Sequence, residues 1–96
     1  MDGMVRWQVH FSGRVQGVGF RYTVVSLAAR FAVAGYVKNL PDGRVLVVAE
    51  GEAREVEGLI QAVRRRMEGY IQACQIEKGV ASGEFGEAGS FEVRYG

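Results

Sequence analysis

Two hydrophobic periodicities alternate along the 96-residue chain, and their order limits the folds open to it. Residues 5–12 alternate between apolar and polar side chains, which is the spacing of a strand with one buried face. Residues 20–33 and 56–67 instead repeat apolar side chains at helical spacing, which predicts two amphipathic helices. The other predicted strands are residues 36–39, 44–50, 70–80 and 91–95. The predicted order is therefore β-α-β-β-α-β-β.

This order predicts an α+β fold of the ferredoxin-like split β-α-β type, in which two helices cover one face of a mostly antiparallel sheet of four or five strands. We expect Gly35 to end the first helix and Gly69 to end the second. The glycine-rich residues 81–89 are expected to form a loop or hairpin connection. With 48% hydrophobic residues and no visible linker, residues 1–96 are expected to form one domain around one core.

Charge and cysteine content exclude several classes of function. Twelve Lys and Arg residues against eleven Asp and Glu residues leave a net charge of +1, so no global field attracts nucleic acid or a membrane surface. The single cysteine, Cys74, permits neither an intramolecular disulfide nor a metal site of several thiolates, and we interpret it as a small apolar residue in a strand. The sequence shows no secretory signal and no apolar run of membrane-spanning length. A cytoplasmic protein is therefore expected.

A glycine-rich segment joins the first predicted strand to the first predicted helix. Gly13, Gly17 and Gly19 allow the backbone to curl and to aim several N–H groups inward, and the helix that follows adds its positive N-terminal end. Arg21 supplies a fixed charge and a planar donor fork suited to phosphate oxygens. The segment therefore predicts an anion site. Its spacing fits neither a Walker loop nor a dinucleotide-binding loop.

A second polar residue is expected to meet this loop. Because the first helix carries the chain back across the sheet, the strand at residues 36–39 should run parallel to the first strand. Its end, at Asn39, then lies at the same edge of the sheet as the glycine loop. We therefore expect Arg21 and Asn39 to converge although they are distant in sequence.

Three runs of residues resemble the acylphosphatase family: Gly13 to Arg21, Gly35 to Gly43, and Val48 to Gly51. The resemblance implies hydrolysis of an acyl phosphate to a carboxylate and inorganic phosphate, without a metal, a cofactor or a covalent intermediate with the protein. It implies that Arg21 binds the substrate and that Asn39 orients the attacking water. The backbone that cradles the phosphate falls on Gly13, Arg14, Val15, Gln16, Gly17, Val18 and Gly19.

The resemblance also implies a small-molecule partner, with inorganic phosphate as product and competitive inhibitor. The size and the balanced charge of the chain permit a monomer, which we expect. Two other readings stay open at this point. A non-catalytic anion-binding module could use the same loop as a sensor, although it would not need Asn39. An RNA-recognition module shares the order of elements, but residues 44–50 offer no aromatic side chain for base stacking.

The sole histidine, His10, is interpreted as a polar strand residue rather than a general base.

Overall fold

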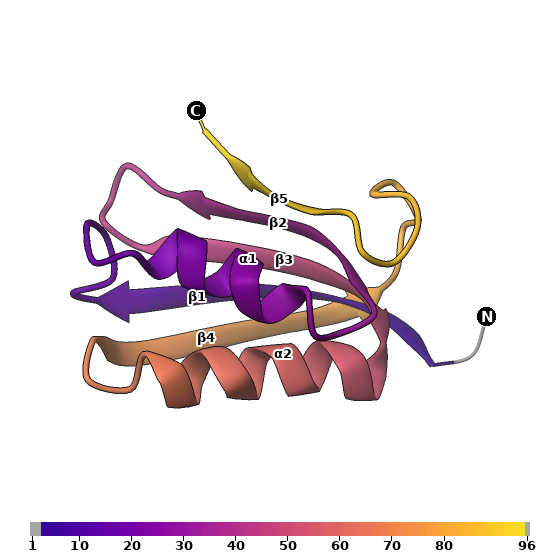
Figure 1. Cartoon of the computed structure of the whole chain (residues 1–96), viewed down its shortest axis with the longest axis horizontal. Helices are drawn as coiled ribbons and strands as arrows, with labels where there is room; N and C mark the ends of the chain where they lie inside the picture. Colours follow the sequence, from indigo (N-terminus) through magenta and orange to yellow (C-terminus); the bar gives the residue numbers. More distant parts are fainter. Residues whose placement is uncertain (1–2, 96) are drawn as a thin grey trace.

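The computed structural model describes residues 3–95 (Figure 1). Its elements follow the predicted order. They are β1 (Met4–Gly13), α1 (Phe20–Ala28), β2 (Val33–Asn39), β3 (Val45–Glu52), α2 (Ala53–Arg66), β4 (Ile71–Val80) and β5 (Phe91–Arg94). No helix in this part of the chain is long and apolar enough to cross a bilayer.

The strands form one five-stranded sheet in the order β4-β1-β3-β2-β5. Strand β3 pairs antiparallel with both β1 and β2, so β1 and β2 run in the same direction, as predicted. Strand β4 is antiparallel to β1, and β5 is parallel to β2. Both helices lie on one face of this sheet (Figure 1), which confirms the ferredoxin-like α+β fold.

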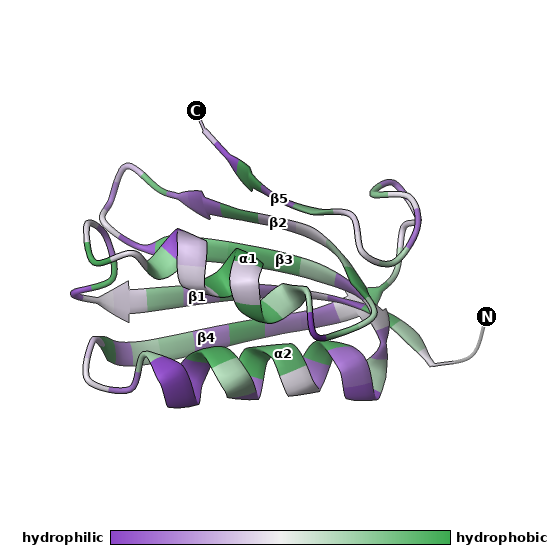
Figure 2. Ribbon diagram, in the orientation of Figure 1, coloured by the Kyte–Doolittle hydropathy of each residue, from purple (hydrophilic) through white to green (hydrophobic). Residues whose placement is uncertain are grey.

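The core lies between the helices and the sheet. Odd-numbered residues of β1, such as Val9 and Phe11, point into it, and their neighbours Val47 and Val45 on β3 share the same face. The second helix contributes a stripe made of Val56, Leu59, Ile60 and Val63. Figure 2 shows the apolar side of each helix turned toward the sheet and a polar outer side. Burial of these stripes is the main term that holds the layers together.

The first helix is shorter than predicted, because it ends at Ala28 rather than near residue 33. Hydrogen bonds from Arg30 N to Leu27 O and from Phe31 N to Ala28 O close a tight turn after the helix. Phe31 then packs against α2, where a Cβ added to Gly58 would lie 2.6 Å from the phenyl ring. Phe31 therefore continues the apolar spacing of the first helix although it lies beyond the end of that helix and packs against α2.

Gly35 does not end a helix, as the sequence had suggested, but lies inside β2. Its φ of 150° falls in the region that favours glycine, and an added Cβ would clash with the carbonyl oxygen of Val48 on β3. This glycine is required because the two strands approach closely at that point.

Residues 81–90 connect β4 to β5 and cross the sheet face that the helices leave open. Glu50 on that face is only 5% exposed and accepts four hydrogen bonds: from Ser82 N at 2.8 Å, Ser82 Oγ at 2.7 Å, Gly83 N at 3.0 Å and Arg6 Nη1 at 3.3 Å. We call these four residues the clasp. The predicted connection is thus confirmed, and the clasp fastens it to the sheet.

Candidate active site

The glycine loop after β1 is anchored in the core at both of its ends. Val15 is fully buried, and Phe20 at the start of α1 is 2% exposed. The Phe20 ring packs on Phe11 of β1, with 5.2 Å between the ring centroids. Val18 lies partly buried against the same core. These contacts hold the loop in one shape before any ligand arrives, which is a requirement for a preorganised site.

Between these anchors the backbone takes the conformations that the glycines were predicted to supply. Gly17 and Gly19 have φ values of 79° and 78°, and Gly19 is the N-cap of α1 without a side-chain capping bond. Within residues 3–95, no acceptor takes a hydrogen bond from the N–H groups of residues 15–21. A run of free N–H groups that continues into a helix N-terminus can bind an anion.

Gly13 and Arg14, the first two residues of the predicted phosphate cradle, pair with residues outside the loop. The N–H of Arg14 donates to the carbonyl oxygen of Tyr70 at 2.9 Å. Gly13 is the last residue of β1, where it pairs with Ile71 and where an added Cβ would clash with the Tyr70 carbonyl. Both residues tie the base of the loop to the turn before β4, so the free donors begin at Val15.

Gln16 ties the same loop to the hairpin between β2 and β3. Its Nε2 donates to the carbonyl oxygen of Leu40 at 2.8 Å and to that of Arg44 at 2.9 Å. Leu40 directly follows Asn39, the last residue of β2. The glycine loop and the end of β2 are therefore linked by a side chain, at the same end of the molecule (Figure 1).

Asn39 faces the helix layer. It pairs with Val45, which in turn pairs across β3 with the buried Phe11 on β1, so all three side chains lie on one face of the sheet. The amide Oδ1 is buried and has no hydrogen-bond partner among the described residues. A buried acceptor without a donor costs stability, and a small molecule such as water can supply the missing donor.

Arg21 lies in the first turn of α1, where its positive charge opposes the helix dipole. In the described part of the chain no carboxylate pairs with it; its guanidinium instead lies 5.2 Å from the centre of the Tyr95 ring. Tyr95 follows Arg94, which pairs with Lys38 directly before Asn39. Arg21 and Asn39 are thus brought to the same end and the same face of the sheet, as predicted.

His10 lies on the other face. It pairs with Leu46 and Gln75, and the alternation along β1 turns it away from the helices. The sheet therefore separates His10 from Arg21 and Asn39, which supports its interpretation as a polar strand residue.

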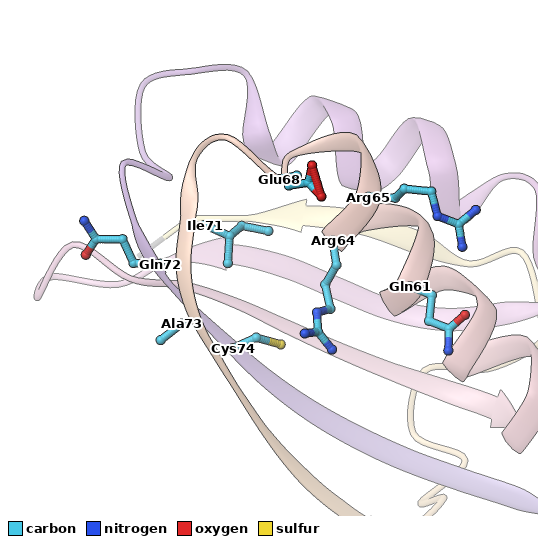
Figure 3. Close-up of a pocket in the computed structure, with 8 residues that line it drawn as sticks. All are labelled: Gln61, Arg64, Arg65, Glu68, Ile71, Gln72, Ala73 and Cys74. Carbon is cyan, nitrogen blue, oxygen red and sulfur yellow. The ribbon is translucent and has the colours of Figure 1, made fainter.

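A groove of about 480 Å³ lies between the C-terminal end of α2 and β4 (Figure 3). Its lining residues are Gln61, Arg64, Arg65, Glu68, Ile71, Gln72, Ala73 and Cys74, so neither Arg21 nor Asn39 belongs to it. Burial raises the pKa of the Cys74 thiol, and nearby Arg64 lowers it less. This favours the protonated, unreactive form of the thiol, and the groove offers no constellation comparable with the glycine loop.

The comparisons with known proteins agree with this geometry. The family model described as Acylphosphatase matches residues 7–93. The chain belongs to the acylphosphatase family. The acylphosphatase of Archaeoglobus fulgidus is 38% identical over 93 residues, which cover 96% of this chain and 100% of that protein. The acylphosphatase of Rubrobacter xylanophilus is 43% identical over 90 residues, which cover 93% of this chain and 79% of that protein.

Solved acylphosphatases share the fold. The crystal structure of the Bacillus subtilis acylphosphatase matches with a TM-score of 0.81 and 30% identity, over 95% of this chain and 99% of that chain. The acylphosphatase of Coxiella burnetii matches with a TM-score of 0.77 and 31% identity, over 96% of this chain and 94% of that chain. Membership of the acylphosphatase family makes the chain an enzyme of the hydrolase class.

Two side-chain contacts at the glycine loop, those of Gln16 and Tyr95, were not predicted from the sequence. The sequence predicts only a backbone role for Gln16, since nothing in it shows that the side chain reaches two carbonyl groups of the hairpin. For Tyr95 the sequence predicts only a position in an alternating strand. That alternation was the available signal, because it places Tyr95 on the same face as Phe91 and Val93, which pack against the core.

Proposed function

We propose that this chain hydrolyses acyl phosphates to a carboxylate and inorganic phosphate, with the glycine loop and Arg21 holding the phosphate and Asn39 orienting the water. One observation carries the proposal: a run of free N–H groups at residues 15–21 ends at a guanidinium that has no anionic partner among residues 3–95. Such a cluster of donors needs an anion, and an acyl phosphate supplies a compact one.

The donors would act on the phosphoryl group. The N–H groups of residues 15–19 and the fork of Arg21 hydrogen-bond to the non-bridging oxygens, where negative charge gathers as the bond to the acyl oxygen breaks. Because the loop is anchored through Val15 and Phe20, the donors need little reorganisation during the reaction. Arg14 contributes less, since its N–H is already bound to Tyr70.

Asn39 would hold the nucleophile. Its unpartnered Oδ1 can accept a hydrogen bond from a water molecule and leave one oxygen lone pair free to attack. A neutral amide is suited to this position, because a carboxylate there would repel the phosphate.

The reaction then balances without a covalent enzyme intermediate. The water oxygen forms a bond to phosphorus, the bond between phosphorus and the acyl oxygen breaks, and the carboxylate leaves with the electron pair. The proton of the water passes to a phosphate oxygen of the substrate itself. Since the carboxylate is a good leaving group, positioning and charge stabilisation are the main demands on the protein.

The test is hydrolysis of benzoyl phosphate, followed by ultraviolet absorbance with a chelator present, because no step in this mechanism passes through a metal. We expect turnover and competitive inhibition by inorganic phosphate. Binding of phosphate without turnover would contradict the proposal and support the non-catalytic sensor.

We further propose that the chain works as a monomer, with residues 1–96 as one domain in the cytoplasm. The balanced charge and the single cysteine of the sequence are consistent with this proposal. Light scattering on the purified protein tests the monomer, and a dimer mass at assay concentrations would contradict it.

A further inference from the structure

The ring of Tyr95 borders the phosphate-binding side chain and also faces solvent. One contact is known: the guanidinium of Arg21 lies 5.2 Å from the ring centre, a distance typical of stacking between a cation and an aromatic ring. The residue is nevertheless 78% exposed. Most of the ring is therefore free to touch another molecule.

Strand β5 sets the position of this ring. It runs parallel to β2, with Val93 paired to Val37 and Arg94 paired to Lys38. Strand β5 ends at Arg94, and Tyr95 directly follows it, just as Asn39 directly follows Lys38. The alternation that turns Phe91 and Val93 toward the core places Tyr95 on the side of the sheet that carries the helices. Tyr95 thus lies against Arg21, at the same end of the sheet as Asn39.

The direction in which a bound acyl phosphate must extend follows from the packing of the loop. Val15 and Phe20 close the inner side of the glycine loop with buried apolar groups. A phosphate bound by the N–H groups and Arg21 therefore leaves only the solvent side for its acyl half. The exposed ring of Tyr95 lies at that side, next to Arg21.

We propose that Tyr95 is a specificity-determining residue that contacts the acyl half of the substrate and favours aromatic acyl groups over small aliphatic ones. The inference rests on the proposed function, since it needs the phosphate to bind at the glycine loop. An aromatic acyl group can pack on the ring, whereas an acetyl group offers too little surface. Such a contact favours the aromatic substrate by about three- to tenfold in kcat/KM.

The test compares benzoyl phosphate with acetyl phosphate in the wild type, Tyr95→Phe and Tyr95→Leu. The ratio of the two kcat/KM values is the readout, because a general disturbance of Arg21 affects both substrates alike. We expect Phe to keep the ratio and Leu to reduce it by about three- to tenfold, through KM for benzoyl phosphate. Tyr22→Leu is the matched control, since Tyr22 on α1 is also an exposed tyrosine, 82% exposed, and its ring has no role in the proposed site.

An unchanged ratio of the two kcat/KM values in Tyr95→Leu overturns the inference, and this includes the case in which both values fall by the same factor. Binding of phenacylphosphonate and acetonylphosphonate, in which CH2 replaces the bridging oxygen, separates this inference from the proposed function. If calorimetry shows tighter binding of the aromatic compound that depends on Tyr95 while neither acyl phosphate is hydrolysed, the inference stands and the proposed reaction fails. If neither phosphonate binds, the inference fails as well.

Discussion

The positive charge of Arg21 lies in an electrostatically unfavourable position unless an anion is bound beside it. An arginine in the first turn of a helix meets the positive end of the helix dipole, and here the N–H groups of residues 15–21 have no acceptor in the described part of the chain. Stacking on Tyr95 orients the guanidinium but does not neutralise it. The unliganded loop is therefore electrostatically unfavourable, and the phosphate of the proposed function would remove that cost.

Replacing Arg21 tests this directly. We expect Arg21→Ala to lower kcat for benzoyl phosphate by at least ~100-fold and to abolish inhibition by inorganic phosphate, because the charged donor is lost from both the substrate and the transition-state complex. Steady-state kinetics give both numbers. Arg30→Ala, an exposed arginine in the turn after α1, is the control. Near wild-type activity in Arg21→Ala would refute the proposed site.

Asn39 is expected to show a different kinetic signature. In Asn39→Ala the water loses its partner while the phosphate donors stay in place, so kcat should fall by about 100-fold with little change in the inhibition constant of phosphate. The pair of measurements separates positioning of the water from binding of the anion. An equal loss of phosphate affinity would mean that Asn39 binds the phosphate instead.

At the level of elements, the site depends on a fixed distance between the glycine loop and the β2–β3 hairpin. Gln16 maintains that distance through its two hydrogen bonds to Leu40 O and Arg44 O. We expect Gln16→Leu to lower kcat by about tenfold, because small errors in placing the water relative to phosphorus are costly. The free energy of unfolding should change by less than about 1 kcal/mol, since the exposed carbonyls can bond to water.

The comparison of kinetics with urea unfolding decides whether Gln16 positions the site or merely stabilises the fold. Gln75→Leu, an exposed glutamine on β4, is the control for the change in side-chain chemistry. If Gln16→Leu loses stability in proportion to activity, the positioning role is wrong.

The elements differ in how well the sequence predicted them. The second helix was predicted at residues 56–67 from its apolar stripe and extends over Ala53–Arg66, so its end was predicted closely and its start lies earlier than predicted. The acidic first turn at Glu55 and the basic last turn at Arg64–Arg66 suit the dipole of this helix. The first helix was predicted too long because Phe31 continues its spacing while packing on α2. The convergence of Arg21 and Asn39 followed from topology alone. The contacts of Gln16 and Tyr95 did not, because they depend on side-chain reach across segments that are distant in sequence.

At the scale of the whole molecule, the clasp fastens the connection that leads into β5 to the end of the sheet opposite the glycine loop, and Tyr95 directly follows β5. Strand β5 is short and pairs only with β2 at the edge of the sheet, so it contributes few hydrogen bonds of its own. The preceding connection is fixed by Glu50, and Phe85 of that connection packs edge-on against Tyr36 of β2 with 5.7 Å between ring centroids. Both anchors stabilise the route of the chain into β5.

The clasp gives stability a defined dependence on pH. Burial alone would raise the pKa of Glu50, but the hydrogen bonds from Ser82, Gly83 and Arg6 outweigh it and lower that pKa. A carboxyl group whose pKa is lower in the folded protein stabilises the fold above its unfolded pKa of about 4.3, and this stabilisation is lost as the pH falls through the folded value.

The substitution Glu50→Gln removes this contribution. The NH2 group that replaces one carboxylate oxygen would face either the N–H of Gly83 or the donors of Ser82 and Arg6, so at least one hydrogen bond is lost in a buried place in both orientations. We expect the variant to lose about 1–3 kcal/mol of unfolding free energy at about pH 7 and clearly less at about pH 3.5, because that pH lies below the unfolded pKa of about 4.3 and part of the stabilisation from the carboxylate is lost there. Urea unfolding at the two pH values measures the difference, and Glu57→Gln on the exposed side of α2 corrects for the loss of one surface charge. A difference that stays the same at both pH values would show that the carboxylate charge of Glu50 does not hold the clasp.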